Sequence, residues 1–304
     1  MKAFNDHHFS HNWRVQFQHL EGAYAPSTMR SYYSDVEAFE TWCHQQALTP
    51  FPATVETVCA FLEAQGQVVA PSTVKRRLYG IRKIHRLLDL PDPTLHENVN
   101  LALRKVRRLR HNRPKQAKGM TRDYLEKFLD VQPDSPWGLR NKAMLSLGYD
   151  LLTRRSELVA LRTEDIAWRR DGTLQVLIRR SKTDQYGDGR IAFTSRRSAT
   201  LLEDWLEYRG MHIAPLFCPI YHGKAINREL TDMVVRRLIR ESAKKAGFDH
   251  SIALAFSGHS MRVGAAQDLL SAGHDTAAIM RAGGWKSVDV LARYLEYAEF
   301  NVWA

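Results

Sequence analysis

The amino-acid sequence predicts a mainly α-helical protein of two domains, the second of which carries a small antiparallel β-sheet. Three observations lead to this prediction. Apolar residues recur three or four positions apart through most of the 304 residues. Strand-like sequence is concentrated at residues 173–180 and 190–193, on either side of a loop that contains Gly187 and Gly189. A polar, basic break at residues 111–119 separates two helical regions.

The first region, residues 20–110, is predicted to be an all-helical domain that follows an N-terminal extension of residues 1–19. Helical spacing of apolar residues is found in four segments, at residues 26–43, 55–65, 71–88 and 101–109. The letters APST stand at residues 25–28 and 70–73, where the first and third of these segments begin. We expect Ser27 to cap the first of these helices, and Ser72 to begin the third in the same way.

The second region, residues 120–304, is predicted to be a mostly helical domain, and residues 111–119 (HNRPKQAKG) are predicted to be the basic linker. One helix is expected to start at Thr121. Further helices are predicted at residues 141–152, 198–209, 227–245, 262–272, 276–282 and 288–300. The two strand-like segments form the predicted hairpin.

The charge of the chain indicates a polyanionic partner. Lysine and arginine number 44 against 33 aspartate and glutamate residues, which gives a formal net charge of +11. Residues 71–118 hold 14 of the basic residues but only three acidic ones, so the excess is concentrated in one segment. This concentration predicts a phosphate-binding surface, with DNA as the expected polyanion.

Other features of the composition bear on location and cofactors. No run of about 18 apolar residues is present, and the first residues lack the apolar stretch of a secretory signal. The cysteines, Cys43, Cys59 and Cys218, are odd in number and far apart, so neither a disulfide framework nor a zinc motif is predicted. We expect a cytoplasmic, nucleoid-associated bacterial protein with no cofactor, metal ion, membrane contact or small-molecule substrate.

Five motifs could together cleave a phosphodiester bond. Such cleavage by a protein hydroxyl needs a nucleophile, cations that neutralise the phosphate oxygens, and an acid for the leaving 5′-oxygen. The motifs are LLTRRSEL at residues 151–158, RSKT at 180–183, GHSMR at 258–262, AGGW at 282–285, and a tyrosine at 294. Any one of them alone is a weak signal, because surface arginines and core histidines are common.

In this order the motifs resemble those of the tyrosine recombinase, or phage integrase, family, and most closely the Cre-type recombinases, over roughly residues 25–300. The resemblance implies the tyrosine recombinase catalytic fold and a catalytic set. The members of that set are Arg154, Glu157, Lys182, His259, Arg262, Trp285 and Tyr294. Glu157 is expected to orient the other groups.

The resemblance also implies a role for each member. The two arginines grip the phosphate, and the indole N–H of Trp285 donates to it. Lys182 protonates the departing 5′-oxygen, and His259 accepts the proton of the tyrosine. Because the arginines stabilise the transition state, no metal ion is expected.

Helix geometry alone leaves two candidates for the nucleophile. Tyr294 and Tyr297 are three residues apart, which is about 300° of helical rotation, so both lie near one face. The family pattern after Trp285 favours Tyr294.

Six further residues are candidates for DNA recognition. In the first domain the basic faces opposite the apolar stripes carry four of them, and by resemblance to the Cre-type core-binding domain they contact bases or nearby phosphates. In the second domain two residues open the predicted helix at 227–245. The six are Arg30, Ser31, Arg76, Arg77, Asn227 and Arg228.

The predicted activity is site-specific recombination through a 3′-phosphotyrosyl intermediate. By resemblance, a homotetramer assembles on two sites with inverted-repeat arms and exchanges strands through a Holliday junction. By resemblance, family members join their protomers with a C-terminal helix. Here the tail after Tyr294 is short, and its apolar candidates for such a contact are Phe300, Val302 and Trp303. The alternatives are type IB topoisomerase-like DNA relaxation and a non-catalytic sequence-specific DNA-binding protein.

Overall fold

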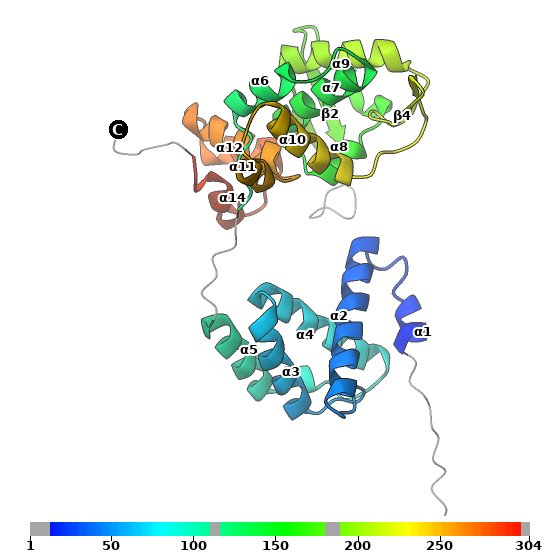
Figure 1. The fold of residues 1–304 in the computed structure, drawn as a ribbon, viewed down its shortest axis with the longest axis vertical. Helices are drawn as coiled ribbons and strands as arrows, with labels where there is room; N and C mark the ends of the chain where they lie inside the picture. Colours follow the sequence, from blue (N-terminus) through cyan, green and yellow to red (C-terminus); the bar gives the residue numbers. More distant parts are fainter. Residues whose placement is uncertain (1–12, 110–115, 180–188, 299–304) are drawn as a thin grey trace, which may run out of the picture. The chain divides into compact units, whose positions relative to one another are not determined.

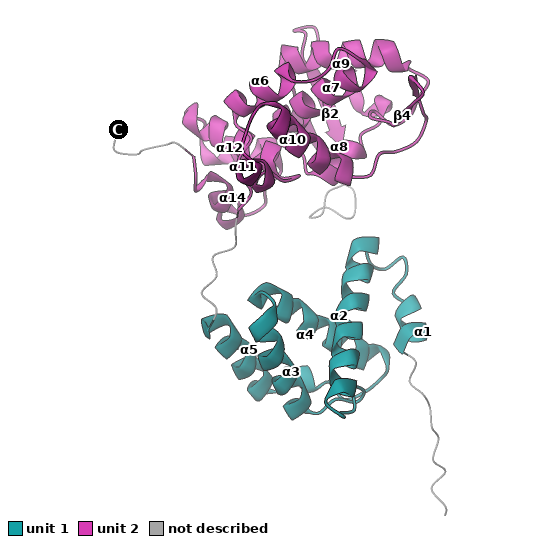
Figure 2. Ribbon diagram, in the orientation of Figure 1, with its two compact units in different colours: residues 1–114 teal, residues 115–304 magenta. Residues whose placement is uncertain are grey.

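The structure is a computed structural model that describes residues 13–109, 116–179 and 189–298. The chain divides into two compact units, residues 1–114 and residues 115–304 (Figure 2). Both units are built mainly from helices, and the second also contains two small antiparallel sheets (Figure 1). The predicted fold class is confirmed.

The described part of the first unit is all-helical. Its elements are α1 (Trp13–Gln18), α2 (Pro26–Gln45), α3 (Val55–Val68), α4 (Pro71–Leu87), the 3₁₀ turn η1 (Pro93–Leu95) and α5 (Glu97–Leu109). Helix α2 packs on α4, and α3 packs on α5, because each helix turns an apolar stripe inward. Helix α1 lies within the predicted N-terminal extension, and its Trp13 and Phe17 are buried in a cluster with Val36 and Ile84.

A buried histidine links two parts of this helical core. The Nε2 atom of His85 accepts a hydrogen bond from the backbone N–H of Ala53 at 3.0 Å, and its Nδ1 lies 2.9 Å from the carbonyl oxygen of Ile81. His85 is fully buried. Burial lowers the pKa of its imidazole, so the neutral form is favoured.

The expectation that Ser27 caps the first long helix is wrong. Ala25 is the N-cap, Pro26 is the first helical residue, and no side chain caps the helix. Helix α4 starts in the same way, with Ala70 as the N-cap before Pro71. Proline suits the first helical position because it has no N–H to satisfy and its φ is already helical, so the following serine already lies within the helix.

The second unit holds the remaining elements. They are α6 (Arg122–Asp130), α7 (Pro136–Asp150), α8 (Arg155–Val159), η2 (Thr163–Asp165), β1 (Ile166–Trp168), β2 (Leu174–Ile178), β3 (Arg190–Phe193), α9 (Arg196–Arg209), β4 (Ile220–Tyr221), β5 (Lys224–Ala225), α10 (Met233–Lys245), α11 (His250–Ala255), α12 (Ser260–Ser271), α13 (Thr276–Gly283) and α14 (Val288–Leu295). The main core lies between the larger helices and the three-stranded sheet, and a smaller cluster gathers under α12, α13 and α14.

Strand β2 is the centre of the three-stranded sheet and pairs antiparallel with β1 and β3. Its alternate residues Leu174, Val176 and Ile178 are buried, as expected for a strand with one face on the core. Because Ile178 pairs with Arg190, the register places the Arg190 side chain on this inner face as well.

The prediction that Asn227 and Arg228 open a helix is wrong. Helix α10 begins only at Met233, and both residues lie in the bend that follows the β4–β5 hairpin. The backbone N–H of Ile226 bonds to Pro219 to close that hairpin. The chain is therefore still turning at Asn227 and Arg228, and the helix starts later.

Candidate active site

Arg154 and Glu157 form a tight pair at the start of α8. The Arg154 Nη1 donates to the Glu157 Oε1 at 2.6 Å, and the Arg154 backbone N–H donates to Oε2 at 3.0 Å. The Glu157 side chain is only 2% exposed. The carboxylate therefore fixes both the main chain and the guanidinium of Arg154. The neighbouring Arg155 turns elsewhere and pairs with Asp232 at 2.8 Å.

Arg262 lies in the first turn of α12 and is completely buried. Its Nη1 donates to the carbonyl oxygen of Leu152 at 2.5 Å. Leu152 has a positive φ of 48°, in the left-handed region that L-residues seldom adopt. The Nε and Nη2 atoms of Arg262 are buried and have no hydrogen-bond partner among the described residues.

Trp285 lies against the guanidinium of Arg262. The Arg262 Cζ is 3.9 Å from the centre of the indole ring, a cation–π contact. The Trp285 Nε1–H is buried and, within the described ranges, also lacks a partner. Gly283 makes room for this ring, because a Cβ there would come within 1.9 Å of it.

The ring of Tyr294, on α14, lies beside Trp285 and Arg262, and the three side chains form one cluster. It meets Trp285 edge-on, with the ring centres 5.2 Å apart and the planes at 67°, and its centre is 5.9 Å from the Arg262 Cζ. Gln267 on α12 donates to the Tyr294 carbonyl oxygen at 3.2 Å, which ties α14 to α12. Three of the predicted site residues are therefore in mutual contact.

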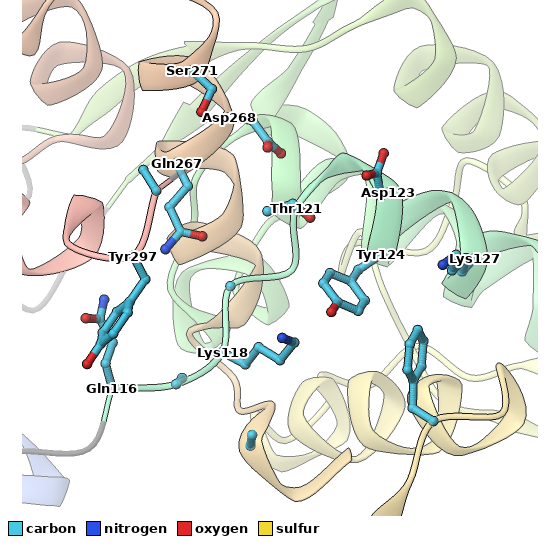
Figure 3. Close-up of a pocket in the computed structure, with 15 residues that line it drawn as sticks. Gln116, Lys118, Thr121, Asp123, Tyr124, Lys127, Gln267, Asp268, Ser271 and Tyr297 are labelled. Carbon is cyan, nitrogen blue, oxygen red and sulfur yellow. The ribbon is translucent and has the colours of Figure 1, made fainter. Parts of the chain in front are cut away.

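Tyr297 lies outside this cluster. It follows the end of α14, is 58% exposed, and lines a cavity of about 700 Å³ together with Gln116, Lys118 and Tyr124. Figure 3 shows its ring beside Gln116, on the opposite side of the cavity from Tyr124. The two candidate tyrosines thus have different surroundings, and Arg262 and Trp285 lie beside Tyr294.

Arg190, which the sequence interpretation did not single out, also reaches the site. Its Nη1 donates to the carbonyl oxygen of Ala282 and its Nη2 to that of Leu151, each at 2.6 Å. Burial lowers the pKa of Arg190 to about 10; of its charged neighbours, Glu157 raises this pKa and Arg154 lowers it. Its partners are distant in sequence, so no local pattern marks it.

The site carries net positive charge. Burial lowers the pKa of Arg262 to about 10, Arg154 lowers it further, and Tyr294 and Glu157 act in the opposite direction. Arg190 also affects this pKa, so the three arginines lie within electrostatic reach of one another. Three guanidinium groups are thus gathered around one carboxylate, that of Glu157, and the site therefore favours an anion.

Two catalytic candidates remain, His259 and Lys182. His259 is the N-cap residue of α12 and is exposed, and its backbone N–H donates to Ser257 Oγ at 3.1 Å. It lies one turn before Arg262. Lys182 and the rest of the RSKT motif lie outside the described residues.

The predicted DNA-reading residues of the first unit lie on α2 and α4. Arg76 holds the buried Asp35 with two hydrogen bonds, from Nε at 2.7 Å and from Nη2 at 2.9 Å, and Arg77 Nε is 3.8 Å from the same carboxylate. Ser31 donates to the Ser27 carbonyl, and Arg30 is exposed. The basic face is thus partly neutralised and ordered by one acid.

In the described part of the chain, no group of three or more histidine, cysteine, aspartate or glutamate side chains is arranged to hold a metal ion. None of the helices described is both long enough and apolar enough to span a membrane.

Comparison with known proteins places the chain in a family. Residues 118–299 match the Phage integrase family, and residues 16–89 match the phage integrase N-terminal SAM-like domain. An integrase/recombinase XerD homologue from Selenomonas ruminantium is 29% identical over 288 residues, which cover 91% of this chain and 83% of the relative. The recombinase Cre of Escherichia phage P1 is 29% identical over 295 residues, covering 90% and 84%.

Solved structures share the fold. XerH site-specific recombinase bound to palindromic difH substrate, in a post-cleavage complex, has a TM-score of 0.64 at 17% identity, over 90% of this chain and 77% of that one. A lambda integrase tetramer bound to a Holliday junction has a TM-score of 0.63 at 15% identity, over 96% and 78%. The family match spans more than half of the chain. The chain therefore belongs to the phage integrase family and is a site-specific tyrosine recombinase that cuts and rejoins DNA.

Proposed function

We propose that Tyr294 is the nucleophile with which this recombinase cuts DNA. The rest of the proposed catalytic set is Arg154, Glu157, Lys182, His259, Arg262 and Trp285. One observation carries the proposal: three buried N–H donors, the Nε and Nη2 of Arg262 and the Nε1 of Trp285, have no partner among the described residues and lie beside the Tyr294 ring. An unsatisfied buried donor costs about 1–3 kcal/mol, and the oxygens of a phosphodiester would satisfy all three.

The proposed reaction conserves the number of phosphodiester-type bonds. The Tyr294 hydroxyl attacks the phosphorus, loses its proton to His259, and forms a 3′-phosphotyrosyl bond. The bond to the 5′-oxygen breaks, and Lys182 supplies the proton that this oxygen takes up. The 5′-hydroxyl of a partner duplex then reverses the step, so neither ATP, a metal ion nor another cofactor is required. Arg154 and Arg262 neutralise the charge that builds on the phosphate.

The proposed assembly is a homotetramer on two double-stranded DNA sites with inverted-repeat arms, exchanging strands through a Holliday junction. The lambda integrase tetramer on a Holliday junction, which shares the fold, supports this arrangement. We propose that residues 20–110 form the core-binding domain, residues 111–119 a basic linker and residues 120–304 the catalytic domain. The match of residues 16–89 to the SAM-like domain supports the first assignment.

DNA contacts are proposed for both units. In the first unit they are Arg30 and Ser31 on α2 and Arg76 and Arg77 on α4. In the second, Asn227 and Arg228 are exposed in the bend before α10, where they can reach phosphates as loop residues. Relatives from a bacterium and a phage support action on bacterial DNA in the cytoplasm.

The nucleophile is tested with Tyr294→Phe and, as the matched control, Tyr297→Phe. The wild-type chain first selects a bound site from a randomised duplex library, and a nicked copy of that site then serves as a suicide substrate. Wild type and Tyr297→Phe should form a covalent protein–DNA adduct on a denaturing gel. Tyr294→Phe should bind the site and form no adduct. An adduct with Tyr294→Phe, or its loss with Tyr297→Phe alone, overturns the assignment.

Strand exchange is tested on the same site. Two differently labelled duplexes should yield a product that joins one label to the other. Relaxation of a supercoiled plasmid without any exchange would instead indicate type IB topoisomerase activity.

A further inference from the structure

We propose that Arg190 is a positioning residue for DNA cleavage, which holds together the two backbone segments that carry the phosphate-binding groups. The proposal rests on the proposed function of the site, because the groups it positions are those assigned to the phosphate.

The first segment is the turn between α7 and α8. Arg190 Nη2 donates to the carbonyl oxygen of Leu151, and Arg262 Nη1 donates to that of the next residue, Leu152. Arg154 follows two residues later. This short turn therefore bonds Arg190 and Arg262 through two consecutive carbonyl oxygens, and Arg154 lies at its end.

The second segment is the end of α13. Arg190 Nη1 donates to the carbonyl oxygen of Ala282, three residues before Trp285. The planar fork of a guanidinium can bond two acceptors at a fixed separation, which a lysine ammonium cannot do in the same way. Arg190 thus sets the spacing between the turn at residues 151–154, to which Arg262 is bonded, and the end of α13, which precedes Trp285.

The AGGW motif provides independent support. Gly284 is the C-cap of α13 with a φ of 67°, and a Cβ at this position would lie 2.7 Å from the Arg190 Cδ. Gly283 leaves space for the Trp285 ring in the same manner. The two glycines therefore make room for two side chains of the site, and one of these side chains is Arg190.

The bonding pattern distinguishes positioning from direct phosphate binding. Both Nη atoms of Arg190 already bond backbone carbonyls, whereas Arg262 has two buried nitrogens without a partner among the residues described. Removing Arg190 should therefore impair the chemical step more than it weakens DNA binding, because small misplacements of reacting groups are costly.

The test compares Arg190→Met and Arg190→Lys with the control Arg196→Met. Arg196 is exposed and also donates to a backbone carbonyl, that of Asp171 at 2.8 Å, but it lies on α9 outside the site. Single-turnover adduct formation on the nicked site, DNA affinity by gel shift and the melting temperature are measured for each variant.

Arg190→Met should cleave about 100-fold more slowly at saturating protein. Arg190→Lys should be slowed only about tenfold, because one charged hydrogen bond is kept. DNA affinity should hardly change in either variant. The control Arg196→Met should match the wild type in cleavage rate and in DNA affinity.

Three results overturn the proposal: a wild-type cleavage rate in Arg190→Met, a loss of affinity equal to the loss of rate, or no advantage of lysine over methionine. If Arg190→Met does not fold, the lysine variant still decides, because it should separate rate from affinity. The wild-type adduct and its absence in Tyr294→Phe test the proposed function separately, so the two failures are distinguishable.

Discussion

Replacing Trp285 with phenylalanine removes one buried N–H and keeps an aromatic ring. In the free protein this N–H has no partner among the described residues, so its loss relieves a penalty of about 1–3 kcal/mol. That gain offsets part of the packing lost with the smaller ring beside Arg262 and Tyr294. We therefore expect the free energy of unfolding to change little.

The cleavage rate should change much more. A hydrogen bond to a charged group contributes about 1.5–3 kcal/mol, which corresponds to roughly a 10- to 150-fold loss of rate if the N–H serves the transition state. Single-turnover adduct formation on the nicked site measures this loss, and urea unfolding measures stability.

Trp205→Phe is the matched control. The buried Trp205 Nε1 donates to the Leu216 carbonyl at 2.9 Å, so its removal leaves an unsatisfied acceptor and lowers the free energy of unfolding. Its folded fraction should cleave at the wild-type rate. The reasoning is refuted if Trp285→Phe keeps the full rate, or if it is destabilised as much as Trp205→Phe.

Two predictions concern the first unit. Because the pKa of His85 is lowered in the folded state, the unfolded chain takes up a proton first as the pH falls below about 6.5. The free energy of unfolding should then decrease by up to about 1.4 kcal/mol per pH unit. Urea unfolding at pH 7.5 and at pH 5.5 measures this decrease, and equal stability at the two pH values contradicts the prediction. Asp35→Asn weakens the bidentate Arg76 pair and should cost about 1–3 kcal/mol, measured in the same way; an unchanged midpoint refutes it.

Local periodicity explains what the sequence could predict. The apolar positions of the segment predicted at residues 71–88 are mostly buried in α4, because a repeat of three and four residues fixes one face of a helix. The buried positions are Val74, Leu78, Ile81 and Ile84, whereas Leu88 is the half-buried C-cap. The order of the motifs likewise singled out Arg262, Trp285 and Tyr294 as candidates, and the fold brings these three side chains together.

Short elements gave no such signal. Helices α1 and α11 have six residues each, and β4 and β5 have two, which is too short for a period to be recognised. Their stability comes from tertiary contacts such as the burial of Trp13 and Phe17.

Arg190 could not be found for a related reason. Its two acceptors are 39 and 92 residues away in the sequence, and a lone arginine at a strand start is typical of a solvated position. Only the register with Ile178 turns it inward. Roles that depend on backbone carbonyls leave no trace in residue types.

The left-handed turn at Leu152 bears on which substitutions the site can tolerate. Because consecutive main-chain oxygens at 151 and 152 hold Arg190 and Arg262, the distance between these cations is set by the path of the chain and not by neighbouring side chains. Side chains in this turn can therefore be exchanged without altering the spacing of Arg190 and Arg262, as long as the chain still makes the turn.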